Sequence, residues 1–226
     1  MDDQLDRVRR AYDLTVSRFR QGIDPYDTVP VEIRNTDFYR SLSSVTGLNS
    51  GAPDVREFLA PESGMKFLDA GCSANLANYG LGDWPSAYYG VDISPALVRA
   101  MKGYAERNGI PVGGLHVAEL SVLPFGDDFF DIAAVIGVLE YCPPEHTGYA
   151  LDELHRVLKP GAKAVLDIPN PDHPHAPDMQ KLEEHLGRPI FLHSRTEFEG
   201  LLSGYFHTVK TDDSRVMIKY FVKKKE

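Results

Sequence analysis

Cysteine is scarce in this sequence, and so is positive charge. Only two cysteines, Cys72 and Cys142, occur among 226 residues, so no framework of disulfide bonds can hold the fold together. Acidic residues outnumber basic residues by 33 to 24, which gives a formal net charge of −9. Nucleic-acid binding needs clustered lysine and arginine, and the basic run here is the terminal Lys223-Lys224-Lys225, which reads as a solvated tail. We therefore expect no nucleic-acid partner.

Long apolar stretches are missing as well. No segment is long enough to cross a bilayer. The first residues, Met1-Asp2-Asp3-Gln4, are acidic, whereas a secretory signal begins with basic residues. These features predict a cytoplasmic protein that has no membrane partner. Hydrophobic residues still make up 42% of the chain, which is enough for the core of one α/β domain with modest additions.

Two short runs carry the strongest signal. Residues 67–73 read as a buried strand followed by a turn of small residues, and residues 89–95 read as a second strand that ends in an acid. Such a turn lets a ligand approach the backbone and meet the N–H groups of a helix N-terminus. Asp92, at the tip of the second strand, is placed to accept both ribose hydroxyls of a nucleoside cofactor. Either a nicotinamide dinucleotide or S-adenosylmethionine suits this arrangement.

The turn itself distinguishes the two cofactors. A dinucleotide site needs the pattern G-x-G-x-x-G, because the glycines let pyrophosphate lie on the backbone. The six positions here are Gly71, Cys72, Ser73, Ala74, Asn75 and Leu76. Only the first glycine is present, so a pyrophosphate site is disfavoured. S-adenosylmethionine contains no phosphate and is favoured.

Further segments continue the alternation of strands and helices. We expect a third strand at residues 116–120 that contains an acid near its end, and a fourth at residues 132–138. Residues 152–161 read as a helix that is stopped by Pro160-Gly161, and a fifth strand follows at residues 164–170. Two strands at about residues 205–211 and 215–222 predict a closing antiparallel hairpin.

With these motifs in this order, residues 60–170 resemble the class I S-adenosylmethionine-dependent methyltransferases, especially the branch that acts on small molecules. The family's D-x-G-x-G-x-G reads Asp69 to Asn75 here, with Ser73 and Asn75 in place of glycines. The resemblance implies an α/β fold with a Rossmann-like, doubly wound, mostly parallel sheet, a C-terminal antiparallel hairpin and an N-terminal helical cap. We expect the cap over residues 1–60 and the methyltransferase domain over residues 61–226, as a single structural unit.

The resemblance also implies which residues hold S-adenosylmethionine. They are Asp69, Gly71, Cys72, Ser73, Asp92, Ile93, Glu119, Leu120, Ile136 and Gly137. Asp69 would order the loop and face the ammonium group of the cofactor, although a helix-capping role is the alternative. Asp92 would bind the ribose, and Ile93 would pack on the adenine. Glu119 would accept from the adenine amino group, beside the N–H of Leu120.

The remaining members of this set belong to the amino-acid end of the cofactor. Gly71 would give close backbone approach, with backbone contacts from Cys72 and Ser73, while Ile136 and Gly137 would border the methionine part. The side chain of Cys72 is expected to pack rather than to act as a nucleophile, because no Cys–His pair is readable from the sequence.

The implied reaction moves a methyl group to an O, N or C nucleophile of a small-molecule acceptor. Because the cofactor supplies the reactivity, the protein mainly aligns and desolvates the reactants. If a general base is needed, the candidates are His146, His173 and His175, each of which also suits an exposed loop. Tyr12 and Tyr141 either close the pocket or pack in the core. No metal-ligand spacing is present, and oligomeric state is left open.

Three alternatives accompany this interpretation. The altered glycines also suit a regulatory or partner subunit that binds the cofactor without catalysis. A nicotinamide oxidoreductase is disfavoured by Ser73 and Leu76. A DNA amino-methyltransferase is disfavoured because residues 136–141 lack the Asn/Asp-Pro-Pro-aromatic motif.

Overall fold

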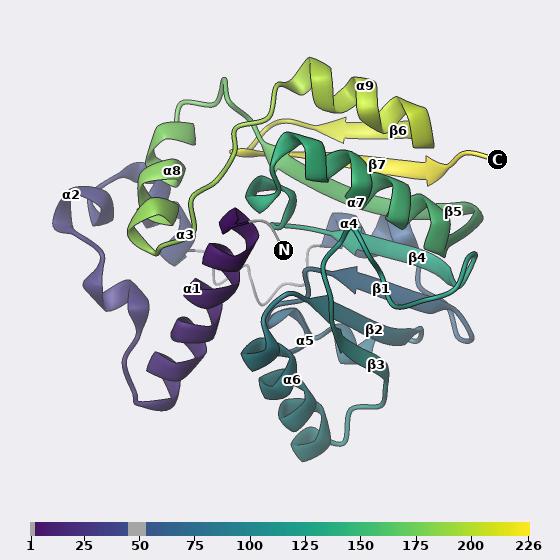
Figure 1. The fold of residues 1–226 in the computed structure, drawn as a ribbon, viewed down its shortest axis with the longest axis horizontal. Helices are drawn as coiled ribbons and strands as arrows, with labels where there is room; N and C mark the ends of the chain where they lie inside the picture. Colours follow the sequence, from purple (N-terminus) through teal and green to yellow (C-terminus); the bar gives the residue numbers. More distant parts are fainter. Residues whose placement is uncertain (1–2, 45–52) are drawn as a thin grey trace.

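Seven strands form one sheet, in the spatial order β3-β2-β1-β4-β5-β7-β6 (Figure 1). The computed structural model describes residues 3–44 and 53–226, without the side chains of residues 41–44. The strands are β1 (Lys66–Ala70), β2 (Ala87–Asp92), β3 (Val112–Val117), β4 (Phe130–Val135), β5 (Leu158–Pro169), β6 (Phe206–Asp212) and β7 (Met217–Lys224). Neighbours among β1 to β5 pair in parallel, and β7 runs antiparallel between β5 and β6. The predicted α/β fold is confirmed.

Helices cover both faces of this sheet. The helical elements of the described residues are α1 (Asp3–Arg20), η1 (Pro25–Thr28), α2 (Val31–Arg34), α3 (Asp37–Ser44), α4 (Pro53–Leu59), α5 (Asn75–Asn78), η3 (Leu81–Asp83), α6 (Pro95–Asn108), η4 (Leu139–Tyr141), α7 (Pro144–Val157), α8 (Ala176–His185) and α9 (Arg195–Tyr205). Leu151 of α7 and Phe198 of α9 are buried in the core of one face. Leu59 of α4 and Met101 of α6 are buried in the core of the other. The sheet is therefore doubly wound.

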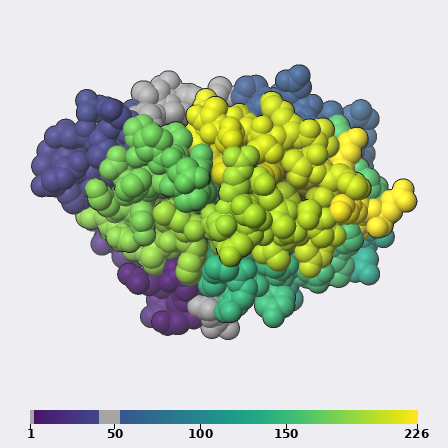
Figure 2. Space-filling view, turned by 90° about the horizontal axis from the view of Figure 1, so that it is seen from above, coloured from purple at the N-terminus to yellow at the C-terminus, as the bar shows by residue number. Residues whose placement is uncertain are grey.

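The remaining helices form a cap at the end of the sheet where β1, β2 and β4 finish. Buried residues of α1, α2, α3 and α8 share one apolar cluster with η4; its buried members are Val8, Val29, Ile33, Phe38, Tyr141, Met179, Leu182 and Ile190. Figure 2 shows the purple and blue N-terminal segments beside the green segment that contains α8. We expected α4 to belong to this cap, but Val55 and Leu59 are buried against the sheet. The cap is thus built from α1 to α3 and from α8.

Strand β3 differs from its predicted position. It covers Val112–Val117, so Glu119 and Leu120 follow the strand instead of ending it. The reason is the pair Gly113 and Gly114, which reads as a loop in the sequence. A Cβ on Gly113 would stand 2.2 Å from the ring of Tyr89 in β2, so glycine lets the two strands pair around that ring.

Strand β4 and its neighbour also shift. β4 ends at Val135, before the predicted Val138, because Gly137 has a φ of +68° that breaks the extended chain. Helix α7 ends at Val157, and β5 starts at Leu158, ahead of the Pro-Gly pair that we expected to separate them. The carboxyl ends of β1, β2 and β4 remain side by side, which is the property that positions the site.

No helix in the described ranges is both long enough and apolar enough to traverse a lipid bilayer.

Candidate functional site

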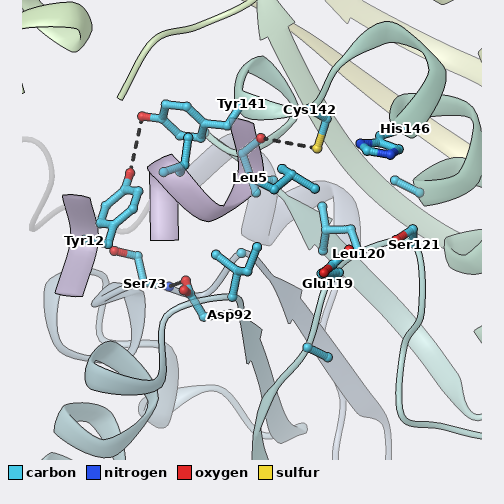
Figure 3. Close-up of a pocket in the computed structure, with 17 residues that line it drawn as sticks. Leu5, Tyr12, Ser73, Asp92, Glu119, Leu120, Ser121, Tyr141, Cys142 and His146 are labelled. Carbon is cyan, nitrogen blue, oxygen red and sulfur yellow. Dashed lines mark hydrogen bonds between the residues drawn. The ribbon is translucent and has the colours of Figure 1, made fainter. Parts of the chain in front are cut away.

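A cavity lies under α1, at the carboxyl ends of β1, β2 and β4 (Figure 3). It encloses about 690 Å³ of space between atoms, with its open mouth included. We call it the first cavity. The predicted residues that line it are Tyr12, Gly71, Ser73, Asp92, Ile93, Glu119, Leu120, Gly137, Tyr141 and His146. Leu5 and Val8 of α1 also line it, and no motif distinguishes these two apolar residues from the core positions of an ordinary amphipathic helix.

The loop after β1 is held against β2 by its own backbone. The N–H groups of Gly71 and Cys72 both donate to the carbonyl of Val91, at 2.8 Å. Gly71 has a φ of +80°, and a Cβ at this position would lie 2.6 Å from Cγ2 of Val138. Ser73, in the place of the second family glycine, also has a positive φ, +38°. The loop therefore keeps its left-handed backbone without that glycine.

Asp92 fixes both sides of this loop. Its Oδ2 accepts from the N–H of Ser73 and its Oδ1 from the N–H of Ser94, both at 2.8 Å. Ser94 in turn caps α6, because its hydroxyl accepts from the N–H of Leu97. Burial raises the pKa of Asp92 to about 6, against the lowering effect of these two backbone donors. Each carboxylate oxygen keeps a lone pair that can accept a further hydrogen bond from a ligand.

Asp13 of α1 connects the cap to the start of α6. The sequence analysis did not predict this role. Its Oδ1 accepts from the hydroxyl of Ser94 at 2.6 Å and from the N–H of Ala96 at 3.2 Å. Its other oxygen lies 3.0 Å from Arg9, one turn earlier in the same helix. An acid at this spacing from arginine is typical of an exposed helix face, so no sequence signal separated Asp13 from a surface residue.

Two predicted residues lie behind the cavity. Asp69 is buried, and its carboxylate accepts from the hydroxyl of Tyr88 at 2.7 Å and from the side-chain amide of Asn75 at 3.2 Å. It thus orders the loop, as expected, while its contact with the cofactor ammonium stays a prediction. Burial raises the pKa of Asp69 to about 6. Cys72 is fully buried beside Gly90, and burial raises the pKa of its thiol, so it is inert as a nucleophile.

Of the other predicted residues, some line the first cavity and others lie in the core or toward the cap. Ile136 packs against the core of the α6 face and does not line the first cavity, whereas Gly137 does line it. His173 and His175 line neither of the two cavities described here, because their loop turns toward the cap, where His175 lies against Phe38. The structure therefore does not bring these two candidates to either cavity, and their role as bases stays a prediction. His146 does line the first cavity, at the end that holds Leu120 and Ser121 (Figure 3). Its Nδ1 is buried without a hydrogen-bond partner in the described part of the chain.

A buried hydrogen-bonded chain joins the cap to the other end of the cavity. The hydroxyl of Tyr12 donates to that of Tyr141 at 3.2 Å, and the hydroxyl of Tyr141 donates to Oε2 of Glu183 at 2.9 Å (Figure 3 shows the first of these). Arg188 pairs with Glu183 at 2.9 Å, and its guanidinium lies 4.8 Å from the centre of the Tyr12 ring. The two tyrosines were expected near the site, but Glu183 and Arg188 belong to no readable motif.

Two further carboxyl groups flank Gly137. Its N–H donates to Oδ1 of Asp167 at 2.7 Å, and a Cβ on Gly137 would lie 3.9 Å from Oε1 of Glu140. Glu140 is buried, and its Oε2 has no hydrogen-bond partner among the residues that the structure describes. Burial raises the pKa of Glu140 well above its usual value, and the charge of Asp167 raises it further. Burial also raises the pKa of Asp167, to about 7.

A second cavity lies on the other side of Tyr12 and Ser73, which line both spaces. It is larger, with about 2000 Å³ of space between atoms, open solvent included. Its wall combines aromatic rings with arginines, namely Tyr12, Phe19, Tyr26 and Tyr39 with Arg20, Arg99, Arg107 and Arg188. Across residues 3–44 and 53–226, no group of three or more His, Cys, Asp or Glu side chains is arranged to hold a metal ion.

Comparison with known proteins identifies the family to which the central domain belongs. Residues 68–166, which run from β1 to β5, match the family model described as a methyltransferase domain. This central part of the chain is thus a methyltransferase domain of the class I, S-adenosylmethionine-dependent type. S-adenosylmethionine is the cofactor of this family, and the family prediction is confirmed.

Individual relatives share this domain. An O-methyltransferase, cnsE of Penicillium expansum, is 33% identical over 124 residues, which are 51% of this chain and 44% of that protein. A 2-phytyl-1,4-naphtoquinone methyltransferase of Nostoc punctiforme is 38% identical over 97 residues, 42% of this chain and 41% of that protein. The methyltransferase chain thus spans less than half the length of these two curated relatives.

Solved structures are similar in fold over nearly the whole chain. Geranyl diphosphate C-methyltransferase from Streptomyces coelicolor superposes with a TM-score of 0.71 at 13% identity, covering 99% of this chain and 98% of that one. This likeness concerns the fold alone, and it includes the cap as well as the sheet.

The loop geometry yields a stability prediction. We expect Gly71→Ala to destabilise the fold by about 2–4 kcal/mol, because the side chain adds both left-handed strain and overlap with Val138. Gly148→Ala is the matched control, since its Cβ would meet nothing within 4 Å in α7 and should stabilise by about 0.5–1 kcal/mol. Urea unfolding measures both. Equal midpoints for Gly71→Ala and wild type would show that the loop is not constrained.

The buried acid beside Gly137 yields a pH prediction. Because the pKa of Glu140 is raised in the folded state, the folded protein keeps a proton that the unfolded chain releases, so stability falls as pH rises above about 4.5. Glu140→Gln cannot titrate, and we expect it to be more stable than wild type at pH 8 by on the order of 1 kcal/mol or more. That gain corresponds to ~2–4 °C in Tm for a chain of this size, and it should vanish near pH 4.

Thermal unfolding of Glu140→Gln between pH 4 and 8 measures this effect. The control is Glu184→Gln, which changes an exposed acid on α8 and should follow the wild-type curve. If Glu140→Gln also runs parallel to wild type, Glu140 does not carry the proton that the geometry assigns to it.

Proposed function

We propose that this methyltransferase moves the methyl group of S-adenosylmethionine to a nucleophilic atom of a small molecule, with the first cavity as its cofactor site. The observation that carries the proposal is the carboxylate of Asp92, which lines that cavity between two backbone donors. Its free lone pairs point to a partner with two adjacent hydroxyls, which is the ribose of the cofactor.

The residues around Asp92 fit the rest of this molecule. Ile93 and Leu120 offer apolar contact to an adenine ring, and Glu119 offers an acceptor for its amino group. At the other end, Gly71 and Gly137 leave the backbone bare where the methionine part would lie. When bound, S-adenosylmethionine supplies a sulfonium-activated methyl group. The protein orients it, and α1 excludes water from above.

We propose the second cavity as the chamber for the methyl acceptor. It meets the first cavity at Tyr12 and Ser73, so a molecule in it can approach the cofactor from the side of the methionine part. Its rings suit an apolar or aromatic body, and its arginines suit an acidic group on that body. The relatives are named for methylation of oxygen, a quinone and an isoprenoid carbon, so their names do not select one attacking atom.

Calorimetric titration with S-adenosylhomocysteine tests the cofactor site. We expect micromolar binding to wild type, and a loss of at least about tenfold in Asp92→Ala, which removes a charged acceptor from the ribose. Binding should also weaken as pH falls through about 6, where Asp92 takes up a proton. NADH should not bind.

The matched control is Asp152→Ala, which removes an exposed acid from α7 and should bind as wild type does. Wild-type protein that does not bind S-adenosylhomocysteine would contradict the proposal. Binding without transfer of labelled methyl to any phenol, carboxylic acid, amine or carbon acceptor would favour the non-catalytic subunit instead.

A further inference from the structure

We propose that Tyr12, Tyr141 and Glu183 form a proton relay that leads from the acceptor to a buried carboxylate, and that the acceptor is therefore a hydroxyl or an amine. This inference rests on the proposed function and deepens it, because it selects the class of attacking atom. The observation behind it is the unbroken chain of hydrogen bonds from Tyr12 through Tyr141 to Glu183.

The chemistry of the groups fixes the direction of this chain. An ionised carboxylate only accepts hydrogen bonds, so the single proton of the Tyr141 hydroxyl is given to Glu183, at 2.9 Å. The oxygen of Tyr141 is then an acceptor, and it receives the proton of Tyr12 at 3.2 Å. The oxygen of Tyr12 is left with lone pairs alone. It can pair only with a donor, such as the O–H or N–H of a ligand.

The position of Tyr12 places this free oxygen where a nucleophile must approach. Tyr12 lines both cavities, the proposed cofactor site on one side and the proposed acceptor chamber on the other. A molecule that reaches the methyl group from the second cavity therefore passes the Tyr12 hydroxyl. A nucleophilic carbon has no O–H or N–H on the attacking atom itself, whereas the attacking oxygen of a phenol or an alcohol, or the attacking nitrogen of an amine, has one.

The surrounding charges suit a proton that ends on Glu183. Arg188 pairs with Glu183 and keeps it able to ionise, while burial raises its pKa and makes it a better base than an exposed glutamate. Burial raises the pKa of both tyrosines, so each passes a proton on as a neutral hydroxyl.

The step balances without any further reactant. The acceptor oxygen or nitrogen forms a bond to the methyl carbon, and the electron pair of the broken carbon–sulfur bond stays on sulfur. The proton of the acceptor moves to Tyr12, the proton of Tyr12 moves to Tyr141, and the proton of Tyr141 moves to Glu183. Glu183 returns its proton to solvent after the product leaves.

Sinefungin is a probe that tests this relay before any acceptor is identified. It carries an ammonium group where the cofactor carries its methyl, so it presents N–H donors at the place that the acceptor faces. Tyr12 accepts from that group, directly or through one water in the place of the nucleophile. We expect wild type to bind sinefungin about tenfold more tightly than S-adenosylhomocysteine, because the hydrogen bond is charge-assisted and leads to a carboxylate.

Tyr12→Phe and Glu183→Gln should both lose this preference, so that each variant binds sinefungin no more tightly than S-adenosylhomocysteine. Tyr12→Phe keeps the ring, so it also guards against the possibility that the loss of the Glu183–Arg188 pair unfolds the cap. Tyr149→Phe is the matched control, because Tyr149 is exposed on α7 and should retain the wild-type preference. Calorimetry gives all these affinities.

Each result has a clear meaning. A preference that is present in wild type and absent in both variants supports the relay. A preference that survives in Tyr12→Phe, or that is absent from wild type, overturns it and leaves the three residues as a structural tie between α1, η4 and α8. Wild type that binds neither ligand overturns the proposed function itself, and the relay with it.

Discussion

The carboxylate of Asp92 is the point on which the arrangement of the site depends. It is a single buried group that holds the loop after β1 through Ser73 and the start of α6 through Ser94. Ser94 then reaches Asp13, so the same chain of contacts sets the position of α1 above the cavity. The sheet, the loop and the cap thus meet at one acid. The positions of all three would therefore affect how a ribose binds to this acid.

Burial gives this end of the sheet an unusual charge balance. Asp69, Asp92 and Asp167 all have a raised pKa because they are buried at or beside the ends of β1, β2 and β5. Folding places these acids out of water, which costs free energy that an apolar site would not require. A cationic cofactor, with its sulfonium and ammonium groups, is the kind of ligand that offsets such an arrangement. The acidic character of the whole chain is thus also found in the site, as a group of buried carboxyl groups.

Residues in local patterns were predictable from the sequence, and residues brought in by tertiary packing were not. Asp92 follows an apolar strand and precedes Ser-Pro, which caps a helix, so its place at a strand tip could be inferred. Gly71 was predictable because a turn after a buried strand needs its backbone freedom. In both cases the neighbours in sequence are also the neighbours that determine the role.

The contrary cases share a physical reason. Glu183 and Arg188 meet Tyr12 only because α8 packs beside α1 in the cap, and no spacing along the chain records that contact. His173 and His175 lie apart from both cavities, because the direction of a proline-rich loop depends on what it packs against. The start of β3 was missed since Gly113 and Gly114 suit a strand only beside the ring of Tyr89. Long-range packing decided each of these outcomes.

The most direct test of this account is hydrogen–deuterium exchange with and without S-adenosylhomocysteine. With the cofactor between the β1 loop, the tip of β2 and helix α1, exchange should slow in residues 71–76, 92–97 and 3–20 when the ligand is bound. The distant hairpin β6–β7 should change little. Protection confined to other segments, or none in α1, would contradict the assignment of the first cavity as the cofactor site.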